Sequence, residues 1–113
     1  MDSRDFIKGT LKPIVLKLLS VHARLYGYQI TQLVRELTSG SIQLTEGALY
    51  PALHQLVDEG ILRTEEEFTG NRKRVYYSLT DYGKVAAQGR LQDFVEFIFL
   101  MSKLFIGSPE KAL

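Results

Sequence analysis

The sequence predicts a mainly α-helical fold that carries one small β-hairpin. Four stretches repeat apolar residues at helical spacing, and three of them begin at a threonine that can cap a helix. A fifth stretch, residues 61–79, places a Thr-Gly-Asn turn before a segment that alternates polar and apolar side chains. The chain has 113 residues, which is enough for one domain with a modest core.

The first long helix is expected to begin after Thr10 and to end near His22. Thr10 can cap it, and Pro13 falls in its first turn, where the missing N–H of proline costs least. The charged residues before it form a short lead in which Phe6 and Ile7 can pack inward. The apolar face of this helix consists of Leu11, Ile14, Val15, Leu18 and Leu19.

Gly27 opens the second predicted helix, and Thr38-Ser39-Gly40 ends it. Its apolar stripe consists of Ile30, Leu33, Val34 and Leu37. The following residues, 41–44, are too few for an independent element. We expect them to pair with the hairpin as a third, minor strand.

The best-bounded helix is expected at residues 45–60. The hydroxyl of Thr45 can accept a hydrogen bond from a first-turn N–H group, and Gly60 suits the position past the end, where a positive φ is needed. Its apolar stripe consists of Leu49, Leu53 and Leu56, with Ala52 and Val57 on the flanks. The opposite face carries Glu46, Tyr50, His54 and Gln55. Such a face suits a helix that contacts DNA, and it is equally typical of an amphipathic surface helix.

Pro51 conflicts locally with this helix. Inside a helix, proline removes the backbone hydrogen bond to the carbonyl four residues earlier, that of Gly47, at a cost of up to about 3 kcal/mol. Gly47 has no Cβ, so the backbone there can bend and lie close to a neighbour. We therefore keep the helix and expect a slight kink.

The hairpin is predicted from Thr69-Gly70-Asn71 and from the strand that follows them. Apolar positions alternate with polar ones in this strand, as in a half-buried strand. Its tip and first residues carry three basic side chains, those of Arg72, Lys73 and Arg74. Because helices followed by a basic-tipped hairpin are typical of a winged helix, the order of elements predicts a winged helix-turn-helix domain. The adjacent Tyr76 and Tyr77 are expected to serve packing.

The last helix is expected to begin at Thr80, which can cap it, with Asp81 favourably placed in its first turn. From Leu91 onward, apolar residues cover most of its circumference, yet the run is too short to span a bilayer. Burial against a second copy of the chain explains such a helix. We therefore divide the chain into a winged helix-turn-helix region, residues 1–83, and a C-terminal dimerisation helix with a short tail, residues 84–113.

Two long motifs are similar to those of a known family. LTEGALYPALHQLVDEGIL and, after it, NRKRVYYSLTDYGK resemble the PadR family of bacterial transcriptional regulators, and Tyr26-Gly27-Tyr28-Gln29-Ile30 resembles that family's signature. The resemblance covers roughly residues 9–83. It implies a homodimeric DNA-binding protein with a pseudo-palindromic operator, usually a repressor, and often one that a small effector releases from DNA.

Together, the helical face, the basic hairpin and the resemblance predict the residues that contact DNA. The basic side chains of the hairpin would neutralise phosphates, and Glu46, Tyr50, His54 and Gln55 would contact bases. The full predicted set is Tyr28, Thr45, Glu46, Gly47, Tyr50, Pro51, His54, Gln55, Asn71, Arg72, Lys73 and Arg74.

The aromatic last helix raises the question of a ligand, because short PadR-like regulators can bind flat, apolar effectors at the dimer interface. A small aromatic or apolar effector would contact residues of that helix, and simple dimer packing is the alternative. The predicted effector and dimer interface consists of Phe94, Phe97, Ile98, Met101, Leu104 and Phe105.

Composition limits the other classes of function. The formal net charge is only +1, so the distribution of charge carries more information than the sum. Arg4 and Lys8 are either phosphate contacts or plain surface charge, and the acidic run at residues 65–67 is expected to be solvated and to face away from DNA.

With no cysteine, two histidines and no nucleophile–base pair, we expect neither catalysis, nor a cofactor, nor a metal site. No signal peptide or membrane span is predicted, so we expect a cytoplasmic protein. The alternative function is a dimeric winged-helix adaptor that binds protein and not DNA.

Overall fold

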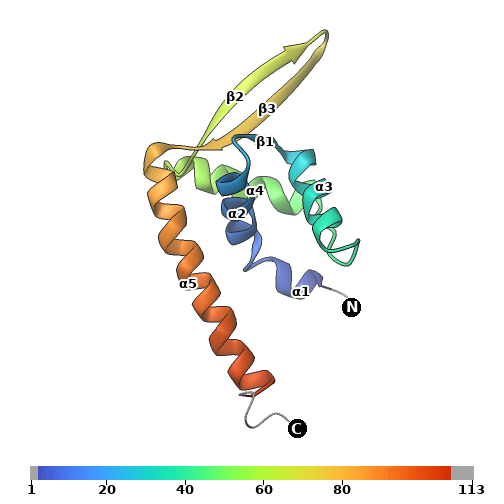
Figure 1. Cartoon of the computed structure of the whole chain (residues 1–113). Helices are drawn as coiled ribbons and strands as arrows, with labels where there is room; N and C mark the ends of the chain where they lie inside the picture. The colour runs from blue at the N-terminus through green and yellow to red at the C-terminus, as the bar shows by residue number, and fades with distance from the viewer. Residues whose placement is uncertain (1–2, 108–113) are drawn as a thin grey trace.

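The structure, a computed structural model, describes residues 3–107. Their helices and strands are α1 (Arg4–Ile7), α2 (Leu11–Val21), β1 (Leu25–Tyr26), α3 (Gly27–Leu37), α4 (Glu46–Asp58), β2 (Leu62–Thr69), β3 (Arg72–Leu79) and α5 (Asp81–Phe105). Figure 1 shows the β2–β3 hairpin projecting from one end of a small helical body, while α5 runs past α2 and extends beyond that body. The predicted mainly helical fold with one hairpin is confirmed.

The core lies between α2, α3, α4 and the first turns of α5. Leu49, Leu53 and Leu56 of α4 have no exposed surface, as the predicted stripe requires. Leu16 is equally buried, although the predicted apolar face of α2 does not include it. Its burial follows from the central position of α2, which packs against α4, α5 and β3 and so has more than one buried face.

The three strands form one antiparallel sheet in the order β1-β3-β2. The third strand is Leu25–Tyr26, which pairs with Tyr77 and Tyr76 of β3, so the prediction that residues 41–44 form it was wrong. Residues 41–44 are held elsewhere, because the hydroxyl of Thr38 accepts a hydrogen bond from the N–H of Ile42 at 3.0 Å. That hydroxyl also lies 2.7 Å from the carbonyl oxygen of Val34, to which it can donate, so the loop folds back onto the end of α3.

Two of the three predicted threonine caps are confirmed. Thr45 accepts a hydrogen bond from the N–H of Ala48, and Thr80 accepts one from the N–H of Gly83. Thr10 does not cap α2, because its hydroxyl donates to the carbonyl oxygen of Ile7 at 2.8 Å. The backbone at Thr10 is already helical, so its side chain closes the turn after α1 and cannot reach the first N–H groups of α2.

Two predicted inward positions are exposed. Phe6 of α1 and Leu37 in the last turn of α3 each keep 71% of their surface exposed. Leu37 lies at the rim of an apolar groove between α2, α3 and α5, so it does not reach the core. The second half of α5 is also exposed. Within residues 3–107, no helix is both long and apolar enough to cross a membrane.

Candidate nucleic-acid interface

The polar face of α4 forms the centre of the candidate interface. Leucines hold the opposite face in the core, so Glu46, Gly47, Pro51, His54 and Gln55 are left exposed. Pro51 lies inside α4, as predicted, and the kink stays a prediction. A Cβ added to Gly47 would meet no atom within 4 Å, so the expected close approach to a neighbour is absent from the described part of the chain. Gly47 is open because it lies in the middle of the exposed face.

Tyr50 lies on the edge of this face that is nearest the sheet. Its ring is half-buried, and a Cβ added to Gly27, the first residue of α3, would lie 2.8 Å from its Oη atom. Burial, and then the carboxylate of Glu46, raises the pKa of Tyr50, so its hydroxyl stays protonated and able to donate a hydrogen bond. The ring of His54 lies 6.2 Å from that of Tyr50, between centroids, on the next turn of α4.

The basic side chains of the hairpin are exposed, but they do not act as one cluster. By the period-two register of β3, Lys73 shares one side of the sheet with Val75, while Arg72 and Arg74 lie on the other. The Nζ atom of Lys73 lies 3.1 Å from a carboxylate oxygen of Glu66. The guanidinium of Arg74 lies 4.6 Å from the centre of the Tyr26 ring, a cation–π contact.

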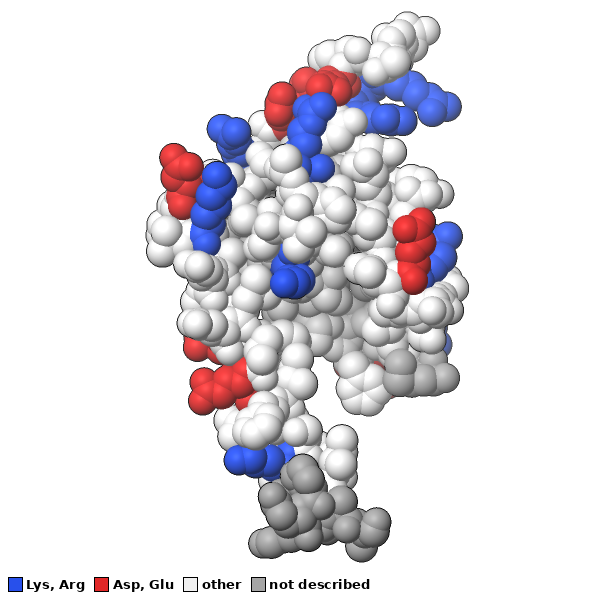
Figure 2. Space-filling view, viewed as in Figure 1, with Lys and Arg blue, Asp and Glu red and all other residues white. Residues whose placement is uncertain are grey.

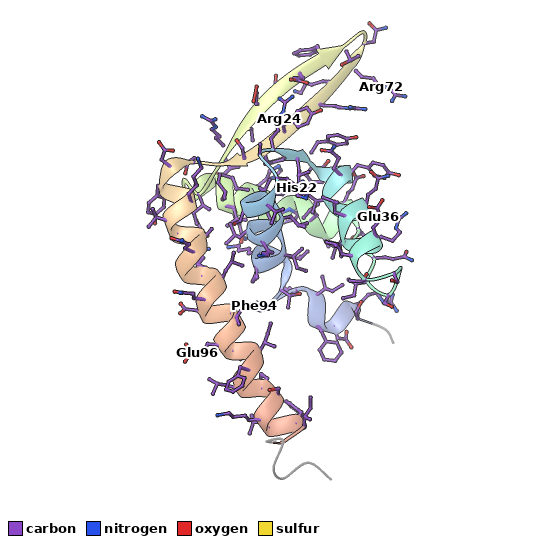
Figure 3. All side chains as sticks on the ribbon, in the orientation of Figure 1. His22, Arg24, Glu36, Arg72, Phe94 and Glu96 are labelled. Atoms are coloured by element: carbon purple, nitrogen blue, oxygen red, sulfur yellow. The ribbon has the colours of Figure 1, made fainter. Side chains whose placement is uncertain are left out.

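The acidic residues 65–67 of β2 form ion pairs with basic side chains. Arg24 forms ion pairs with Glu65 at 3.4 Å and with Glu67 at 2.7 Å, and the hydrogen bond to Glu67 raises the pKa of Arg24. Its guanidinium also lies 3.9 Å from the centre of the Tyr76 ring. Figure 2 shows acidic and basic side chains side by side on the hairpin, and Figure 3 shows Arg24 nearer the base of the hairpin than Arg72. Among the described residues, no group of acidic and histidine side chains could hold a metal ion.

Arg24 was not among the residues predicted from the sequence. The available signal was a basic residue directly before a short apolar pair, but its partners are more than forty positions away in the chain. The prediction that Tyr76 and Tyr77 serve packing agrees with the structure: Tyr77 is 3% exposed, and Tyr76 packs edge-on against Tyr26.

Residues of α4 and of the hairpin line one hollow of about 310 Å³. It lies between the start of α3, one edge of α4 and strand β3. Among the predicted DNA contacts, those that line it are Tyr28, Glu46, Tyr50, His54, Lys73 and Arg74. Pro51 and Gln55 line a different groove on the other edge of α4. Asn71 and Arg72 are exposed at the tip of the hairpin.

The predicted effector and dimer residues do not share one pocket. Phe94 lines the apolar groove between α2, α3 and α5, which has a volume of about 470 Å³. Figure 3 shows Phe94 and Glu96 on opposite sides of α5, with Phe94 on the side toward α2. The others lie further along α5 and outside the lining of that groove: Phe97, Ile98, Met101, Leu104 and Phe105.

Comparison with known proteins agrees with this geometry. The model of the transcriptional regulator PadR-like family matches residues 15–89. An uncharacterized protein of Lysinibacillus sphaericus is 30% identical over 93 residues, which cover 81% of this chain and 84% of that protein. A transcriptional regulator from Clostridium thermocellum superposes with a TM-score of 0.77 at 25% identity, covering 91% of this chain and 97% of that one. Bacillus subtilis PadR, solved in complex with operator DNA, superposes with a TM-score of 0.62 at 30% identity, covering 76% of this chain and 46% of that one.

Proposed function

Because the chain belongs to the PadR-like family of transcriptional regulators, we propose that it is a homodimeric repressor that binds a pseudo-palindromic operator in duplex DNA. The observation that carries the proposal is the hollow in which the polar face of α4 meets the basic strand β3. The similarity to B. subtilis PadR, solved in complex with operator DNA, supports it. We place its action in the cytoplasm, with residues 1–83 as the DNA-binding region and residues 84–113 as the dimerisation segment.

In this proposal, α4 enters the major groove and the hairpin lies along the adjacent backbone. Glu46, Tyr50, His54 and Gln55 contact base edges, where glutamine pairs well with adenine and glutamate with cytosine. The hairpin supplies phosphate contacts that position the protein and carry no sequence information themselves. The remaining members of the predicted set contact DNA beside these groups: Tyr28, Thr45, Gly47, Pro51, Asn71, Arg72, Lys73 and Arg74.

The second half of α5 supports the homodimer. Most of its large apolar side chains are more than half exposed in a single protomer, among them Phe97, Phe99, Leu104 and Phe105. A continuous exposed apolar surface of this kind marks an interaction site, and a second copy of the same helix matches it by two-fold symmetry.

The apolar groove beside Phe94 supports a small aromatic or apolar effector that binds at the dimer interface. Its volume, about 470 Å³, falls in the range usual for small-molecule sites. Such a ligand would alter DNA affinity only by binding one arrangement of the two protomers more tightly than another.

The double variant Arg72→Ala/Arg74→Ala tests the DNA-binding part of the proposal. Each lost phosphate contact makes the plot of log affinity against log salt less steep by about 0.9. Because both protomers of the dimer lose two contacts, we expect a change of about 3.6 and an affinity lower by roughly tenfold or more. The measurement is fluorescence anisotropy with a labelled operator duplex over a series of salt concentrations.

The matched control is Arg35→Ala/Lys84→Ala, which removes the same charge from the end of α3 and the start of α5. It should bind DNA nearly as the unchanged protein does. If both double variants bind as tightly as the unchanged protein, the hairpin does not contact DNA. If the unchanged protein itself binds no duplex, the dimeric adaptor becomes the better description.

A further inference from the structure

We propose that Lys8 and Arg4 form a second phosphate-contacting edge, on the side of α4 opposite the hairpin. This inference rests on the proposed function, since it assumes that α4 enters the major groove. In this inference, a groove near the N-terminus binds the DNA backbone of the strand that the hairpin does not contact.

The exposed face of α4 has two edges. At 100° per residue, Gly47 and Pro51 lie near its middle, while Glu46 and Tyr50 lie on one edge. Ala48 and Gln55 lie on the other. The hairpin borders the first edge, because Lys73 and Arg74 line the same hollow as Glu46 and Tyr50.

A groove of about 560 Å³ borders the second edge. One wall is α4, which contributes mainly small or apolar side chains there. The other wall is α1 and the start of α2, which contribute three basic residues. Among residues 3–107, no acidic residue lines the groove. The residues that define it are Arg4, Lys8, Lys12, Ala48, Pro51 and Gln55.

The charges around this groove leave Lys8 available. Lys12 is held by Glu59, with Nζ 3.1 Å from a carboxylate oxygen, and Glu59 also binds Arg90 at 2.7 Å. Within residues 3–107, no ion pair joins Lys8 to a carboxylate within 4 Å, and its side chain is exposed. The acidic residue nearest in sequence, Asp5, is exposed and lies outside the groove lining.

The major groove has a phosphate backbone on each side, about 12 Å apart. A helix lying in that groove therefore has one backbone along each of its edges. The hairpin contacts one backbone, and Lys8 and Arg4 lie on the side of α4 that faces the other backbone. The small side chains of Ala48 and Pro51 leave room for a backbone to approach the floor of the groove, and the described part of that floor is apolar and has no carboxylate.

Phosphate ethylation interference with the operator duplex tests this assignment in Arg4→Ala/Lys8→Ala. Because both protomers lose two contacts, we expect the salt slope to flatten by about 3.6 and the affinity to fall by roughly tenfold or more, with the sequence preference unchanged. Within each half-site of the operator, interference should disappear from phosphates on one strand only. In Arg72→Ala/Arg74→Ala it should disappear from the opposite strand of the same half-site.

The control is again Arg35→Ala/Lys84→Ala, and circular dichroism should show equal helix content in all variants. A wild-type salt slope and a full interference pattern in Arg4→Ala/Lys8→Ala, beside a clear loss in the hairpin variant, would overturn this inference and leave the proposed function standing. If the unchanged protein bound no duplex, both would fail.

Discussion

Replacing Gly83 with alanine is expected to lower the free energy of unfolding by at least about 3 kcal/mol. The added Cβ would lie 2.0 Å from the carbonyl oxygen of Ile61 and 2.9 Å from its carbonyl carbon. These are backbone atoms, and the same oxygen accepts a hydrogen bond from the N–H of Thr80 at 3.0 Å. Because Ile61 is 1% exposed, relief requires α5 to separate from the end of α4.

Urea unfolding followed by circular dichroism at a fixed protein concentration measures this effect. Gly89→Ala is the matched control in the same helix, since its Cβ would meet no described atom within 4 Å. There, alanine should be neutral or stabilise by about 0.5–1 kcal/mol, as in an ordinary helix interior. A Gly83→Ala protein that unfolds at the wild-type urea midpoint would contradict the packing described at Ile61.

The double variant Phe97→Glu/Leu104→Glu is expected to be a folded monomer with operator affinity lower by about 10²–10⁴-fold. Both side chains are more than half exposed in the protomer, so glutamate there should leave the protomer fold intact. In the dimer, the same positions would carry unpaired charge into an apolar interface. The loss of affinity follows because two half-sites are no longer bound by linked protomers.

Sedimentation equilibrium and operator binding measure this prediction together. The control, Gln88→Glu/Gln92→Glu, adds the same charge to exposed polar side chains nearer the start of α5. It should remain dimeric and bind DNA. A double Phe97/Leu104 variant that sediments as a dimer would show that another surface joins the protomers.

Local patterns were sufficient where local chemistry decides the structure. Thr45 and Thr80 cap their helices, and the stripe of Leu49, Leu53 and Leu56 is buried, because hydroxyl groups and leucines at these spacings have few other stable arrangements. Gly60 has a φ of 74°, as its position after α4 requires.

Tertiary pairing was harder to predict. Residues 25–26 and 41–44 are both short segments beside a helix, and only the three-dimensional position of β3 selects Leu25–Tyr26 as its partner. Thr10 is a residue type that often caps helices, but its hydroxyl instead donates a hydrogen bond to the carbonyl oxygen of Ile7 in α1.

The candidate interface was predicted in part for the same reason. Helical and strand periodicity identified the exposed face of α4 and the basic hairpin. Periodicity could not show that Glu66 neutralises Lys73, or that Arg24 holds Glu65 and Glu67, because each contact crosses between strands or elements.

The most direct test of operator binding is to measure how the unchanged protein binds duplex DNA from upstream of its own gene, compared with random DNA of equal length. Both are titrated with salt from about 50 mM upward, where phosphate contacts dominate the response. For a sequence-specific repressor of its own gene we expect tight binding to the upstream fragment alone, with log affinity falling linearly and steeply with log salt. Equal, salt-insensitive binding to both fragments, or none at low salt, would contradict it.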